Sequence, residues 1–109
     1  MDLVFHALAD ATRRDIVARV ISREQSVSDL ASAYTMSFAA VQKHVAVLER
    51  AMLITKERRG REQIVHPEAS MLGRAARLLD SYEEIWRART ERIDWILAEE
   101  PKNTALGKA

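Results

Sequence analysis

The residues best suited to chemistry are two polar side chains and the cluster of cations that follows them. Gln42 and Lys43 are adjacent in a stretch without glycine or proline. A glutamine amide can form two hydrogen bonds with adenine, and a lysine can reach guanine acceptors or a phosphate. A short segment further along holds four more cations: Lys56, Arg58, Arg59 and Arg61. Base contacts followed by phosphate contacts indicate nucleic-acid recognition.

An amphipathic helix is predicted to carry the first pair. Ser37 is a good N-cap, and no helix breaker occurs in the next fifteen residues. At about 100° per residue, one stripe is apolar; it consists of Val41, Val45, Leu48 and Met52. Gln42 and Lys43 fall on the opposite side, together with Ala39, Ala46 and Arg50. This slim, basic outer face suits a helix lying in the major groove.

The first turn of this helix is expected to assist base contact through Phe38 and Ala39. Phe38 either contacts thymine methyl groups or packs on the preceding turn near Tyr34, and the sequence leaves both open. Ser37 is assigned a capping role and a secondary phosphate contact. His44 is assigned a hydrogen bond to backbone or phosphate, because no partner at metal-ligand spacing is nearby.

A β-hairpin is predicted directly after the helix, with residues 53–58 and 61–65 as strands around Arg59-Gly60. Its cations are expected to contact phosphates or the minor groove. Arg13 is expected to reach a phosphate as well. Arg14 either does the same or pairs with a neighbouring aspartate.

Three short helices are predicted before this pair of elements. They cover residues 3–9, a segment capped by Asp10 or Thr12, and residues 26–33 with Ser28 as a candidate cap. The turn at 34–36 then joins a short helix to a longer one, which is a helix-turn-helix. The predicted fold is mainly α with a small β-hairpin: a winged helix-turn-helix.

A long helix is predicted after Pro67, with a seam at 3-4 spacing: Leu72, Ala75, Leu79, Tyr82, Trp86, Arg89, Ile93 and Ile96. A domain this small cannot cover such a seam itself, so a homodimer is predicted. The proposed interface residues are Leu3, Leu72, Leu79, Tyr82, Trp86, Ile93 and Ile96. The aromatic residues are interpreted as dimer packing in preference to a ligand pocket.

The predicted organisation is one domain over residues 1–100, with the dimerisation helix at about 68–100. Pro101 is expected to end that helix, and residues 101–109 to form a flexible tail. The apolar runs are too short to span a membrane and no leader is visible, so a cytoplasmic protein without membrane contact is expected.

Charge is distributed unevenly along the chain. The net charge is +1, but residues 37–63 hold six Lys/Arg against three Asp/Glu, and residues 68–100 hold five against eight. Nucleic acid responds to the local patch. The absence of cysteine excludes disulfides and thiolate metal sites. The chain has no Gly-rich phosphate loop and no recognisable serine–histidine–acid arrangement, so neither an enzyme nor a cofactor is predicted.

Three ordered motifs together resemble the ArsR-type (arsenical-resistance repressor) winged-helix family: residues 7–14 (ALADATRR), 26–31 (SVSDLA) and 40–49 (AVQKHVAVLE). The resemblance implies four helices, a hairpin and a fifth helix, with dimerisation through the first and last helices. It also places base-contacting residues at Gln42 and Lys43. It implies repression by occupying an inverted repeat in promoter DNA.

The chain departs from the family pattern at its metal sites. Ser26 and Ser28 stand where arsenic- and lead-sensing members have a cysteine pair, and hydroxyls do not replace thiolates for a soft metal. No histidine follows His66, where zinc- and nickel-sensing members have ligands. We therefore predict the branch without metal-sensing sites.

The chain also departs from the family pattern at Met52, where the family usually has a glycine suited to positive φ.

The predicted function is a homodimeric, sequence-specific regulator of transcription that binds double-stranded DNA. Two modes of control are left open: a small-molecule effector at the dimer seam, of which the sequence names none, and autorepression alone. The alternative is a winged-helix module that binds a protein partner through its C-terminal helix, without specific DNA binding.

Overall fold

The computed structural model describes the backbone of residues 1–104 and the side chains of residues 1–98. Two compact units divide this part of the chain: Met1–Ala75, and a second unit that begins at Ala76. The elements, in chain order, are α1 (Asp2–Leu8), α2 (Ala11–Ser22), β1 (Gln25–Ser26), α3 (Val27–Ser32), α4 (Phe38–Arg50), β2 (Ile54–Arg59), β3 (Glu62–Pro67) and α5 (Ala69–Thr104).

The first unit is held together by one apolar core that all of its helices share. The predicted stripe of α4 is buried at Val41, Val45 and Leu48, each at most 1% exposed. These side chains share a cluster with Ile16 of α2 and Leu30 of α3. Burial of this kind stabilises by roughly 1.5–3 kcal/mol for each large aliphatic side chain. The core therefore fixes which face of α4 is left outside.

Met52 does not belong to the buried stripe, which corrects the prediction. Helix α4 ends at Arg50, and Met52 is 53% exposed. Its φ is 62°, in the left-handed region. The amide of Leu53 donates to the carbonyl of Leu48 (3.1 Å), and that of Met52 to Glu49 (2.9 Å). This pair of bonds is the Schellman ending of a helix, which turns the chain and points position 52 away from the core.

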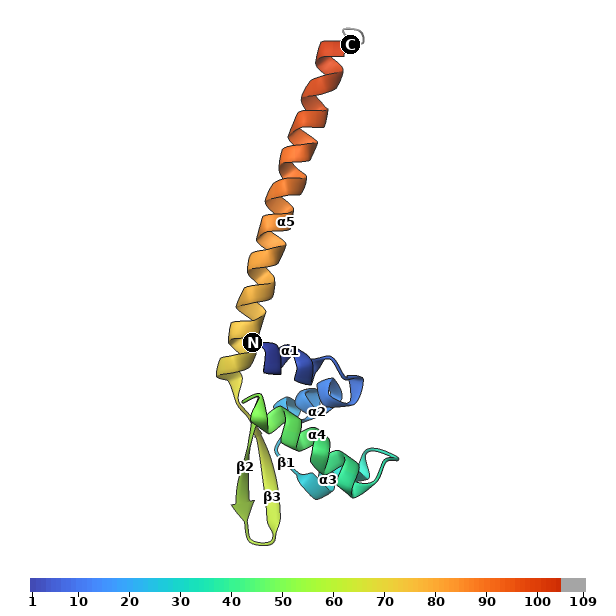
Figure 1. Cartoon of the computed structure of the whole chain (residues 1–109), viewed down its shortest axis with the longest axis vertical. Coiled ribbons are helices and arrows are strands. Elements are labelled where there is room, and N and C mark those ends of the chain that lie inside the picture. The colour runs from blue at the N-terminus through green and yellow to red at the C-terminus, as the bar shows by residue number, and fades with distance from the viewer. Residues whose placement is uncertain (105–109) are drawn as a thin grey trace. The chain divides into compact units, whose positions relative to one another are not determined.

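A three-stranded antiparallel sheet in the order β1-β3-β2 completes this unit. Arg59 pairs with Glu62, so Gly60 and Arg61 form the two-residue turn. The turn is therefore one residue later than predicted, because Gly60 is the residue with positive φ (65°). Figure 1 shows the β2–β3 hairpin extending beyond helices α1–α4 of this unit.

Strand β1 was not predicted. Gln25 pairs with Val65 and Ser26 with Ile64, so this short strand joins the start of α3 to the hairpin. Ser26, rather than the predicted Ser28, is the N-cap of α3. The expected helix start was too early, because residues that pair with a strand are extended.

Helix α5 begins at Ala69, two residues after Pro67. It continues through Pro101 and is described as far as Thr104, so the prediction that Pro101 ends it was wrong. A proline removes only the i→i−4 hydrogen bond of its own position, and the amides that follow it can still pair with carbonyls one turn earlier. The rest of the predicted tail, residues 105–109, lies outside the described residues.

Candidate nucleic-acid interface

Two serine caps set the ends of the helix-turn-helix. The Ser26 hydroxyl accepts a hydrogen bond from the Asp29 amide (3.0 Å), and the Asp29 carboxylate accepts one from the Ser26 amide (3.1 Å). This reciprocal capping box fixes where α3 begins. The Ser37 hydroxyl accepts from the Ala40 amide (3.1 Å) and caps α4. Ser37 therefore has the capping role that the sequence predicted.

The turn between α3 and α4 is fastened to α2 by Tyr34. Its hydroxyl donates to the Asp15 carboxylate, and the Arg19 guanidinium lies 5.5 Å from the ring centroid. Burial, together with this hydrogen bond, raises the pKa of Tyr34 to about 12. The same bond from Tyr34, followed by that from Arg19, lowers the pKa of Asp15. The sequence did not reveal this cluster, whose members are separated by up to 19 residues.

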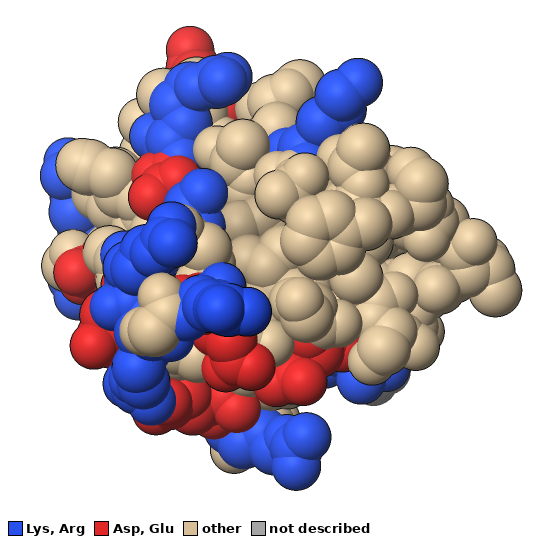
Figure 2. All heavy atoms as spheres, turned by 90° about the horizontal axis from the view of Figure 1, so that it is seen from below, with Lys and Arg blue, Asp and Glu red and all other residues tan. Residues whose placement is uncertain are grey.

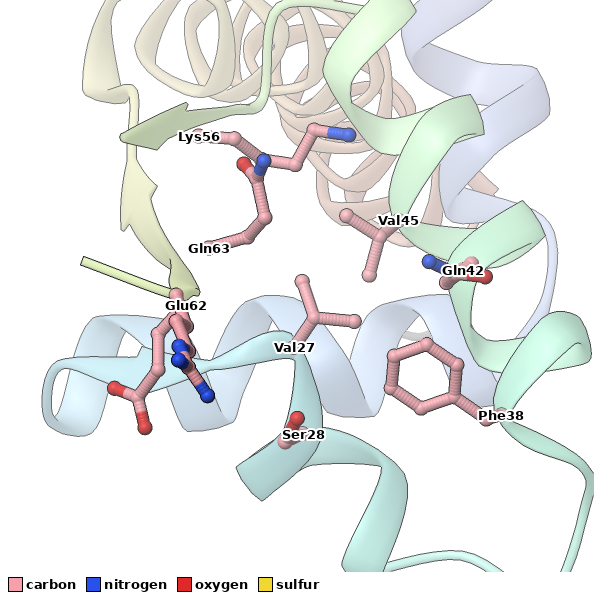
Figure 3. A pocket seen from close by; sticks show the side chains of 9 residues that line it. Val27, Ser28, Phe38, Gln42, Val45, Lys56, Glu62 and Gln63 are labelled. Atoms are coloured by element: carbon pink, nitrogen blue, oxygen red, sulfur yellow. The ribbon is translucent and has the colours of Figure 1, made fainter. Parts of the chain in front are cut away.

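The outer face of α4 presents the side chains predicted to contact bases. Phe38, Ala39, Gln42 and Lys43 are all exposed. Phe38 and Gln42 also line a pocket of about 280 Å³ between α4, the start of α3 and the hairpin, together with Val27, Val45, Lys56 and Gln63. In Figure 3 the Phe38 ring points toward Val27, while Lys56 and Gln63 face the same hollow from the hairpin. The structure leaves both roles of Phe38 open. Its ring points toward Val27 and is still 47% exposed.

The cations of the hairpin differ in how freely they can meet a ligand. The Lys56 ammonium lies 3.3 Å from a Glu49 carboxylate oxygen, and Arg58 Nε donates to the Gly60 carbonyl (3.2 Å). Arg59 pairs with Glu24 and with Glu57. Figure 2 shows lysines and arginines gathered with carboxylates between them, on the side where Figure 1 places the hairpin. The predicted basic wing is thus a mixed surface with an excess of cations.

Arg13 has partners inside its own domain. Its Nε donates to the Ala7 carbonyl (2.7 Å) and Nη2 to that of His6 (3.1 Å), so it satisfies the C-terminal end of α1. Its Nη1 lies 3.2 Å from His44 Nδ1. Arg14 donates to the Leu8 carbonyl (2.9 Å) and also caps α1. Both arginines are therefore held at the C-terminal end of α1, and Arg13 also contacts His44 in the middle of α4.

The predicted seam of α5 is exposed where it belongs to the second unit. Leu79, Tyr82, Trp86, Ile93 and Ile96 are between 45% and 65% exposed, and Leu3 of α1 is 54% exposed. Leu72 differs, because it packs partly against the core of the first unit. Arg89, the one polar residue in the seam, lies with its guanidinium 5.9 Å from the Trp86 ring centroid. That stacking accounts for an arginine at an apolar position.

Comparison with solved structures decides the family. An ArsR-like transcriptional regulator from Rhodococcus sp. RHA1 is 31% identical, with 90% of each chain covered and a TM-score of 0.77. The chain belongs to the ArsR family. A possible transcriptional regulator for arsenical resistance is also 31% identical over 79% of this chain and 92% of that one, with a TM-score of 0.68. No protein-family model and no curated protein matches the chain.

The winged helix-turn-helix fold predicted from the sequence is confirmed by a further ArsR-family similarity. A homodimeric winged helix-turn-helix DNA-binding domain from Mycobacterium bovis, described as a possible ArsR-family regulator, has a TM-score of 0.62. It is 22% identical, over 76% of this chain and 77% of that one. At this identity the likeness concerns the fold. The order of the elements in this chain and its long last helix agree with a winged helix-turn-helix fold.

Ser26 and Ser28, which the sequence resemblance aligns with a cysteine pair, differ in their surroundings. Ser26 is 2% exposed and caps α3, while Ser28 is exposed at the edge of the pocket beside α4. Among the side chains that the structure describes, no three His, Cys, Asp or Glu residues are grouped to hold a metal ion. Nor is any helix in that part of the chain long and apolar enough to cross a membrane.

Proposed function

We propose that this ArsR-family chain is a homodimeric transcriptional repressor that binds an inverted repeat in double-stranded DNA. The observation that carries the proposal is the exposed outer face of α4, which presents Gln42 and Lys43 beside a cationic hairpin. The buried stripe of α4 and strand β1 hold that face and the hairpin on one scaffold. A rigid scaffold is what direct readout of base edges needs.

In this proposal the two sets of side chains have different tasks. Gln42 and Lys43, helped by Phe38 and Ala39, select sequence in the major groove. Lys56, Arg58, Arg59 and Arg61 supply affinity through phosphates, which makes binding dependent on salt. Ser37, Arg13 and His44 act mainly by positioning α4, since their polar groups already have partners in the domain.

Dimerisation is proposed from the exposed seam of α5. Covering these apolar side chains with a partner would stabilise the complex by roughly 25 cal/mol for each Å² of apolar surface removed from water. A second copy presents the same seam, and a twofold arrangement matches an inverted repeat with half-sites about one helical turn apart. The Mycobacterium bovis domain is described as homodimeric, which supports the same assembly here. A dimer seated on a promoter would block transcription by occupying it.

The test is a gel-shift titration of the full chain with DNA from its own upstream region, repeated at several salt concentrations with unrelated competitor. We expect a discrete complex that survives the competitor and contains two protein chains. A smear that disappears at moderate salt would contradict sequence-specific binding. A monomer without discrete DNA complexes would favour the alternative, a protein-binding module acting through the exposed apolar residues of α5.

A further inference from the structure

One cation of the hairpin is held by two carboxylates. Arg59 Nη1 pairs with Glu24, and Arg59 Nη2 lies 3.1 Å from Glu57 Oε1. All three side chains are about half exposed. In keeping with this, the Glu24 hydrogen bond raises the pKa of the Arg59 guanidinium. A phosphate approaching Arg59 therefore meets a cation whose charge is already balanced.

The two carboxylates are not equivalent partners. Glu57 Oε1 also lies 2.7 Å from His66 Nε2, and the two residues belong to the paired strands β2 and β3. Glu57 is thus shared within the hairpin. Glu24 comes from outside the hairpin, in the short link between α2 and β1, 35 residues before Arg59. Glu24 is the contact that ties the end of strand β2 back to the body of the domain.

We propose that Glu24 tunes the DNA affinity of this protein by competing with DNA phosphate for Arg59. This inference rests on the proposed function. In free protein the carboxylate of Glu24 occupies the donors of Arg59. On DNA a phosphodiester oxygen takes that place, and Glu24 returns to water with its negative charge near the backbone. Each wing therefore binds less tightly than its cations alone would allow.

Removing the charge of Glu24 while keeping its size is the direct experiment. Glu24→Gln is expected to tighten binding by about 1.4-fold to fivefold per wing, the range for exposed ion pairs, and so by about 2- to 25-fold for a dimer. The salt dependence should become steeper by up to about one unit of slope per wing, because the released Arg59 then neutralises a phosphate without freeing a carboxylate.

A double-mutant cycle separates this contact from a general effect of charge. Glu24→Gln is measured in the wild-type and in the Arg59→Gln background, and in the second the gain should fall to the general effect of removing one carboxylate. Glu62→Gln is the matched control, because Glu62 lies opposite Arg59 in the hairpin but takes part in none of the ion pairs among the described side chains. Its effect gives the general contribution of one carboxylate at the wing.

Each variant is titrated with the upstream fragment and with an unrelated duplex of equal length, after circular dichroism confirms folding. Phosphate contacts carry no sequence information, so the gain should appear with both duplexes. Unchanged binding of Glu24→Gln would overturn the inference, and weaker binding would overturn it and indicate that Glu24 orients Arg59 toward DNA. An equal gain in the Arg59→Gln background would overturn it as well. Wild-type protein that does not distinguish the two duplexes contradicts the proposed function instead.

Discussion

Individual side chains at the proposed interface divide into those with partners in the domain and those left free for a ligand. The polar groups of Arg13 and Ser37 form hydrogen bonds with the ends of helices α1 and α4. Gln42 and Lys43 are exposed, and among the described side chains neither takes part in the side-chain hydrogen bonds or ion pairs. A side chain without a competing partner loses little when it binds, so specificity is expected to reside in these two.

Gln42→Ala should cost on the order of 1–3 kcal/mol on the cognate site and relax the choice of base. The reason is that a bidentate amide contact is lost while the phosphate contacts remain. Competition gel shifts with a panel of single-base variants of the site measure both effects. Arg61→Ala serves as the comparison, since it should weaken all sequences alike. Unchanged selectivity in Gln42→Ala would mean that α4 does not read the bases as proposed.

Tyr34 should titrate at about pH 12, well above the ordinary tyrosine value of 10.0. Because the folded pKa is above the unfolded one, this residue stabilises the fold fully below about pH 10, and that stabilisation is lost as the pH rises through about 12. The difference in tyrosinate absorbance between wild type and Tyr34→Phe isolates this ionisation. A midpoint near 10 would show that Tyr34 is not held against Asp15 in solution.

At the scale of elements, the junction after α4 carries backbone strain at Met52, and a single substitution can remove that strain. Met52 occupies the left-handed position of a Schellman ending, where a side chain costs about 1–2 kcal/mol. Its own side chain is half exposed and gains little from burial. The junction matters because it sets the direction in which the hairpin leaves the helix.

Met52→Gly should raise the free energy of unfolding by about 0.5–1 kcal/mol, since relief of the left-handed strain exceeds the added entropy of glycine in the unfolded chain. Urea denaturation followed by circular dichroism measures the change. Met52→Ala keeps a Cβ at the same φ and should bring no such gain. An equal gain from alanine would place the cost in the methionine side chain rather than in the backbone.

The elements with strong local periodicity could be predicted from the sequence. Helix α4 and the hairpin follow from a regular apolar stripe and from the glycine at the turn. Strand β1 could not be predicted, because two residues carry no periodicity and their partner strand lies about forty positions away. The pairing of Arg59 with Glu24 is hidden for the same reason. The exposed positions of Gln42 and Lys43 were predictable, since burial of the opposite stripe determines them.

On the scale of the whole molecule, attraction to DNA is confined to one part of the chain. Residues 37–63 carry an excess of three positive charges, and residues 68–100 an excess of three negative charges. The acidic segment is also the one with the exposed apolar seam. In the proposed function, separate segments would therefore contact the two kinds of partner: phosphates by the first, and a second copy of the chain by the other.

Trp86→Glu should convert the proposed dimer into monomers, because it places a carboxylate at the centre of the seam in α5. Ala88→Glu adds the same charge on the opposite side of the helix and should leave the dimer intact. Size-exclusion chromatography with light scattering distinguishes the two. The monomeric variant should also lose the discrete operator complex. A dimer that persists in Trp86→Glu would contradict association through this seam.

The short strand β1 has a mechanical consequence for the wing. Its two residues pair with β3 at Ile64 and Val65, in the middle of that strand, so toward the turn only the last two pairs, Arg58–Gln63 and Arg59–Glu62, have no third strand beside them. Beyond those pairs, this end of the hairpin is held to the rest of the domain by the exposed Arg59–Glu24 ion pair, which is a weaker restraint than a third strand. Helix α4, by comparison, packs against the apolar core along its whole buried stripe and is stiffer. In the proposed complex with DNA, the end of the hairpin nearest the turn would therefore adjust to minor grooves of different widths more readily than α4 could shift in the major groove.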